Sequence, residues 1–141
     1  MEDRRRAAVA AIVVLLAGCG GGGGQRVPDE DAASAAVLGF SKAFGAGKGE
    51  EACDLLTDDA RAAFLKRVQT LITTDDCATA MTKVHDEAGD DVNEAFQSAT
   101  VSNVEVNGGS ASVTLTASGH STTVGLADQD GEWRLTGVPG I

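Results

Sequence analysis

Residues 107–119 have the sequence NGGSASVTLTASG, and this stretch decides the fold class. Within it Ala111, Val113, Leu115 and Ala117 alternate with Ser and Thr, which is the period-two pattern of a half-buried strand. The preceding Asn107-Gly108-Gly109 is a strong hairpin-turn signal, and the following Ser118-Gly119 turns the chain again. The stretch therefore predicts one strand held between two tight turns.

Similar patterns flank it on both sides. A β-rich run over about 100–106 ends with Val104 and Val106, and Val124 and Leu126 alternate with other residues over about 122–127. The acidic stretch 128–131 turns the chain into a last strand, about 132–136. Strands joined by such short turns predict a four-stranded antiparallel meander.

The sequence before the strands has helical spacing instead. Apolar residues, the acidic pairs and two glycines predict helices over about 31–44, 50–56, 58–68 and 75–87. Asp31 is expected to cap the first, Thr57-Asp58-Asp59 the third and Thr74-Asp75-Asp76 the fourth. Gly89-Asp90-Asp91 is expected to end the fourth. Helices followed by strands predict an α+β domain over residues 31–141, with N-terminal helices packed on a curved four-stranded antiparallel sheet.

The beginning of the chain has the pattern of an export signal. Arg4-Arg5-Arg6 precede an uncharged run over 7–18, which is too short to span a bilayer as a stable helix. The run ends in Leu16-Ala17-Gly18-Cys19, which resembles a bacterial lipobox. The resemblance implies that residues 1–18 are a lipoprotein signal peptide and that a lipid is attached to Cys19. The protein is then expected to be lipid-anchored on the outer face of the bacterial cytoplasmic membrane.

Residues 19–30 carry this lipid and continue as a tether. Five consecutive glycines and a polar stretch without apolar periodicity predict a flexible coil with an end-to-end distance of roughly 18 Å. A phosphate-binding glycine loop would need a strand before it, a helix after it and usually a lysine, and none of these is present.

The charge excludes two classes of partner. Residues 1–18 have three arginines and two acidic residues, so the remainder of this chain of net charge −10 has a net charge of −11. Nucleic acid requires clustered Lys and Arg, and anionic lipid headgroups attract basic segments. The membrane is therefore expected to be reached only through Cys19.

Two cysteines remain once Cys19 is lipidated. In an exported protein Cys53 and Cys77 are expected to form a disulfide, which would stabilise the fold by roughly 3 kcal/mol. The spacing is not that of a CxxC motif, and His85 and His120 are the only histidines, so we expect neither a metal site nor a cofactor.

Aromatic residues are scarce, with four Phe, one Trp and no Tyr. Phe40, Phe44, Phe64 and Trp133 are therefore candidates for either the core or the wall of a ligand pocket. For Trp133 the core is favoured, because burying so large a ring contributes much to a small domain.

The order of elements and the ending Asp130-Gly131-Glu132-Trp133-Arg134-Leu135 resemble the NTF2-like superfamily, in particular its small actinobacterial lipoproteins. Supporting segments are 52–56, Ala60-Arg61 and Cys77-Ala78. The resemblance implies a cone in which helices close a bent sheet around a pocket. Some members are isomerases or dehydratases and others are accessory domains, so the resemblance does not define an activity.

The residues themselves contain no recognisable catalytic set. His85 is expected on a solvated helix surface, His120 in an exposed turn, and the acidic pairs at helix ends, where they complement the helix dipole. Residues 128–132 lack most positions of a calcium loop. We therefore expect a non-enzymatic binding or accessory domain for an envelope protein or a small apolar ligand. The alternatives are an isomerase or hydratase acting on a small apolar substrate, and a spacer domain without a ligand.

Overall fold

The computed structural model describes residues 29–141, which form five helices followed by four strands. The predicted signal peptide, Cys19 and the tether up to residue 28 lie outside the described residues. The elements are α1 (Glu30–Gly45), α2 (Gly49–Asp54), α3 (Asp58–Val68), α4 (Cys77–Ala88), α5 (Asp90–Gln97), β1 (Thr100–Asn107), β2 (Ser110–Ala117), β3 (His120–Gln129) and β4 (Glu132–Leu135).

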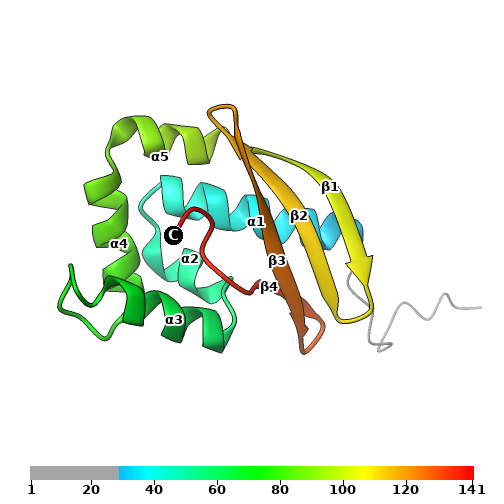
Figure 1. Cartoon of the computed structure of the whole chain (residues 1–141), viewed down its shortest axis with the longest axis horizontal. Coiled ribbons are helices and arrows are strands. Elements are labelled where there is room, and N and C mark those ends of the chain that lie inside the picture. The colour runs from blue at the N-terminus through cyan, green and yellow to red at the C-terminus, as the bar shows by residue number, and fades with distance from the viewer. Residues whose placement is uncertain (1–28) are drawn as a thin grey trace, which may run out of the picture.

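The strands form one antiparallel sheet in the order β1-β2-β3-β4, and its outer strands are not paired into a barrel. Helix α1 crosses one face of this sheet, and the other four helices gather around the C-terminal half of α1 (Figure 1). The predicted α+β class and the meander are confirmed.

The turns have the backbone geometry that the residues predict. Both Ser118-Gly119 and Asp130-Gly131 have positive φ at their two residues, as a type I′ hairpin turn requires. Asn103 also has a positive φ, and the pairing of β1 with β2 shifts between Ser102 and Glu105. This bulge places Val101 and Val104 on the same face despite their odd spacing, which the sequence pattern did not predict.

Acidic and hydroxyl side chains cap the helices as predicted, except at the first helix. Thr57 Oγ1 accepts a hydrogen bond from the Ala60 N–H at 3.0 Å, and Asp76 caps α4. The expectation that Asp31 caps the first helix is wrong, because α1 already begins at Glu30. Its cap is Asp29, whose Oδ1 accepts from the Ala32 N–H at 2.9 Å.

The core lies between α1 and the inner face of the sheet. Its buried side chains come from every helix except α5 and from β2, β3 and β4, and include Phe40, Phe64, Val113, Leu126 and Leu135. The opposite face of β2 carries Ser and Thr, so burial follows the alternation by which the strand was predicted.

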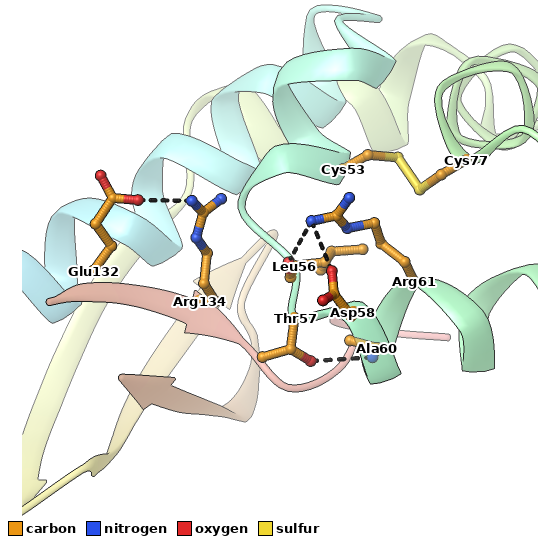
Figure 2. Close-up of polar contacts among 9 residues, drawn as sticks. All are labelled: Cys53, Leu56, Thr57, Asp58, Ala60, Arg61, Cys77, Glu132 and Arg134. Atoms are coloured by element: carbon orange, nitrogen blue, oxygen red, sulfur yellow. Dashed lines mark hydrogen bonds and ion pairs between the residues drawn. A yellow bond between two sulfur atoms is a disulfide. The ribbon is translucent and has the colours of Figure 1, made fainter. Parts of the chain in front are cut away.

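The segment between α2 and α3 forms backbone hydrogen bonds with the sheet. Leu56 forms a parallel bridge with Leu135 of β4, and the Leu135 N–H donates to the Leu55 carbonyl at 2.7 Å. In Figure 2 the Arg61 guanidinium reaches back from α3 to the Leu56 carbonyl and the Asp58 carboxylate. The predicted disulfide between Cys53 and Cys77 is present with a Cα–Cα distance of 6.1 Å, and it joins α2 to α4.

Among residues 29–141, no helix has both the length and the apolar character that crossing a bilayer requires.

Candidate functional site

Two apolar clefts open at the end of the molecule where α5 meets the turn between β2 and β3. The larger has a volume of about 350 Å³, and the smaller has about 190 Å³. Ligand pockets in proteins range from about 300 to 1,000 Å³, so the larger cleft suits a small ligand. Both clefts are bordered by Val92, Phe96, Pro139 and Gly140, so they are neighbours on either side of the last residues of the chain.

Hydrocarbon groups form most of the walls. In the larger cleft Val92, Ala95 and Phe96 of α5 face Leu115 and Ala117 of β2. The smaller cleft adds apolar residues of α1, α4 and the C-terminal segment, namely Phe40, Phe44, Val84, Ala88, Val138 and Ile141. This arrangement can hold an apolar molecule by excluding water from both surfaces.

Helix α5 is held in place by its close crossing with α1. Gly45 makes this possible, because a Cβ there would lie 2.5 Å from the Asn93 carbonyl oxygen. The Gln97 Nε2 donates to the Gly45 carbonyl at 2.7 Å, and the Ser41 hydroxyl donates to the Phe96 carbonyl at 2.5 Å. The side chains of α5 that line the clefts are therefore positioned by polar contacts behind them.

His85 takes part in the same positioning, which corrects the prediction of a solvated surface histidine. It is half-buried, and its Nδ1–H donates to the Phe44 carbonyl at 2.8 Å. The Asn93 Nδ2 donates to the His85 carbonyl at 2.9 Å, which fixes the corner between α4 and α5. The Phe44 ring packs edge-on against Phe96 with ring centroids 4.8 Å apart.

The four aromatic candidates divide between the core and the clefts. Phe40 and Phe44 are buried and also border the smaller cleft, so they serve in both. Phe64 and Trp133 are buried and border neither cleft. The Trp133 Nε1–H donates to the Asp29 carbonyl at 3.3 Å, which attaches the start of α1 to β4.

The helix that contributes most to this site was not predicted from the sequence. A break was expected at residues 89–91 with no element before the first strand, whereas α5 begins at Asp90. Val92, Ala95 and Phe96 have the spacing of one helical face, and Asp90-Asp91 suits a first turn. That signal was present in the sequence, although it spans only two turns.

Titratable groups are few at the clefts. Asp91 and His120 border the larger cleft from opposite sides, and both are exposed. Within residues 29–141 no three His, Cys, Asp or Glu side chains are grouped as metal binding would require. Neither cleft therefore presents a buried acid–base pair.

A third hollow, of about 900 Å³, lies beside α4 and the loop that precedes it. Among the described residues, the exposed large hydrophobic side chains are Leu71 (86% exposed), Val92 (42%) and Ile141 (37%). Leu71 borders this third hollow, whereas Val92 and Ile141 border the smaller cleft. Exposed apolar side chains are therefore found both at the clefts and at the hollow beside α4.

No known protein family, curated protein or solved structure matches this chain.

Proposed function

We propose that this protein is a lipid-anchored, non-enzymatic binding domain of the NTF2-like type, held on the outer face of the bacterial cytoplasmic membrane. Its ligand is a small apolar molecule that enters the cleft between α5 and the β2–β3 turn. The observation that carries this proposal is the cleft of about 350 Å³ with walls of Val92, Ala95, Phe96 and Leu115.

The start of α1 lies far from the larger cleft, which supports a binding domain on an N-terminal tether. Asp29 contacts Trp133 of β4, close to the Asp130-Gly131 turn at one end of the sheet. The larger cleft borders Ser118, in the turn at the other end of β2. An eight-residue strand spans roughly 25 Å, so the cleft lies at the end of the sheet opposite to the start of α1.

The disulfide supports an extracytoplasmic location. Cys53 and Cys77 are joined across α2 and α4, and disulfides persist in oxidising compartments but are rare in the bacterial cytosol. The Leu16-Ala17-Gly18-Cys19 motif supplies the anchor in this proposal.

Two alternatives are less well supported by the geometry. An isomerase or hydratase needs a positioned acid or base, and Asp91 and His120 are exposed on opposite sides of the larger cleft rather than buried in its floor. A spacer domain does not require apolar side chains along open clefts. Exposing such apolar surface to water is unfavourable in free energy.

The anchor is tested by replacing Cys19 with Ser. The wild-type protein is expected in the membrane fraction and the variant in the soluble fraction after signal-dependent export. A variant that remains in the membrane fraction would refute lipid attachment at Cys19.

The cleft is tested by filling it. Ala95→Phe adds a ring inside the larger cleft, whereas Ala62→Phe adds the same ring to an exposed position of α3. Both substitutions are made in the chain that carries Cys19→Ser, and dodecanol binding is measured by calorimetry without detergent. We expect Ala95→Phe to weaken binding at least tenfold and Ala62→Phe to leave it unchanged. Equal binding by both variants would refute the cleft as the ligand site.

A further inference from the structure

The charged groups around the clefts are strongly one-sided. Among the side chains that border the two clefts there is one carboxylate, that of Asp91, and no Lys or Arg. Asp90 and Glu94 lie on the same helix as Asp91, and all three are exposed. No ion pair among the described residues involves any of the three.

Two features oppose this negative charge, and both are weaker than it. The N-terminus of α5 carries a helix dipole equivalent to roughly half a positive charge, which one carboxylate alone outweighs. His120 borders the larger cleft opposite Asp91 and could carry a positive charge only when protonated. The other polar residues that border this cleft are Ser118, Ser121 and Thr122, which are uncharged. The Ser121 hydroxyl is hydrogen-bonded to Thr116 on the opposite face of the sheet.

We propose that the larger cleft binds single-chain amphiphiles with a cationic head and discriminates against those with a carboxylate head. This inference rests on the proposed function, since the apolar chain must occupy the cleft. The chain then lies between Phe96 and Leu115, and the head lies at the mouth beside Asp91. Opposite charge at that mouth is attractive for an ammonium group and repulsive for a carboxylate.

The expected selectivity is measurable but moderate, because the carboxylates are exposed and salt screens them. At 0.1 M ionic strength the screening length is about 10 Å, so we expect Asp91, which borders the cleft, to contribute more than Asp90 and Glu94, which do not border it. We expect a preference for the amine over the carboxylate of about tenfold at low ionic strength, decreasing as salt is added.

The experiment compares three probes with the same twelve-carbon chain, namely dodecylamine, dodecanol and dodecanoate. They are titrated into the full chain carrying Cys19→Ser at about pH 8. Probe concentrations stay below micelle formation. The expected order of affinity is amine, then alcohol, then carboxylate.

Three variants separate charge from folding. Asp91→Asn combined with Glu94→Gln should weaken amine binding and strengthen carboxylate binding, each about threefold to tenfold. Glu105→Gln is the matched control, because Glu105 is an exposed carboxylate of β1 that borders neither cleft. Thr122→Lys adds a cation to the β3 side of the cleft, because Thr122 lies on the same face of the sheet as its partner Leu115. It leaves α5 unaltered and should shift the preference toward dodecanoate.

The outcomes distinguish this inference from the proposed function. Suppose that Ala95→Phe weakens dodecanol binding as expected. If the three probes then bind equally, or if the charge variants behave like Glu105→Gln, the inference on the cationic head is overturned and the proposed apolar ligand site stands. If dodecanol binding is insensitive to Ala95→Phe, the proposed function fails, and the inference fails with it. The expected probe order, shifted toward dodecanoate by Thr122→Lys, supports both.

Discussion

Substituting Gly45 with Ala is expected to destabilise this protein, although the same change in the interior of an exposed helix usually stabilises it. Alanine is favoured over glycine in a helix by about 1 kcal/mol, and Gly45 is the last residue of α1. The structure reverses the sign, because α5 crosses α1 at this residue. A Cβ on residue 45 would lie 2.5 Å from the Asn93 carbonyl oxygen and 2.9 Å from the Gln97 backbone nitrogen.

The magnitude follows from what must move. Both near atoms belong to the backbone, so the contact is relieved only by shifting α5 away from α1. Overpacking of this kind costs about 1–3 kcal/mol. The shift also stretches the hydrogen bond from Gln97 Nε2 to the Gly45 carbonyl, which contributes about 1 kcal/mol. After the helix preference is subtracted, we expect a net loss of about 1–3 kcal/mol in the free energy of unfolding.

Urea unfolding followed by circular dichroism measures this loss, and Gly39→Ala is the internal control. Gly39 lies on the same helix, but a Cβ there meets only the flexible Leu55 Cδ1, at 3.4 Å. The control should be neutral or stabilised by up to about 1 kcal/mol. Dodecanol binding should weaken in Gly45→Ala alone, because α5 supplies one wall of the cleft. Equal stability of the two variants would refute the account of the α1–α5 crossing.

Two further predictions concern the helices around α4. Replacing Cys53 and Cys77 together by Ser should lower the free energy of unfolding by about 3 kcal/mol. A reducing agent should destabilise the wild type but not the double variant. Equal stability of the wild type and the double variant in urea unfolding would contradict this prediction. The pKa of Asp76 lies below its usual value because its carboxylate accepts hydrogen bonds from the hydroxyl and the backbone N–H of Thr79. A lowered folded-state pKa stabilises the fold above the unfolded-state pKa, and this contribution is lost as the pH falls through the folded value. The stability difference between wild type and Asp76→Ala should therefore be larger at neutral pH than at about pH 2, and a difference that grew in acid would exclude this cause.

Local signals in the sequence were sufficient for most of the secondary structure. The alternation from Ser110 to Ala117 predicts β2 with its observed bounds, and the Gly-containing turns predict the pairing order, because such short turns leave adjacent strands no other partner. Thr57 predicts the start of α3 since its hydroxyl satisfies an N–H of the first turn, whatever surrounds it. Because lipid attachment is expected at Cys19, the two remaining cysteines were expected to pair with each other.

Features that depend on contacts between distant segments could not be predicted in this way. The bulge at Asn103 compensates for the odd spacing of Val101 and Val104, and it is needed only because both side chains face the same core. His85 looks like a surface residue in its own helix and becomes half-buried only because the Phe44 carbonyl approaches it. Helix α5 is too short and polar to be a strong signal, and it is stabilised by its crossing with α1.

The sequence by itself determined the fold class and the strand order, because each depends on residues close in the chain. The disulfide partners followed from the number of cysteines together with the expected lipid attachment at Cys19. Only the tertiary structure decided where the proposed ligand site lies. The larger cleft joins Val92 and Phe96 to Leu115 and Pro139, and these residues are brought together by the packing of α5 against α1 and the end of the sheet. The pattern of apolar residues along one element indicates which side chains face inward. It does not predict a cleft between two elements, because a cleft depends on how both elements pack.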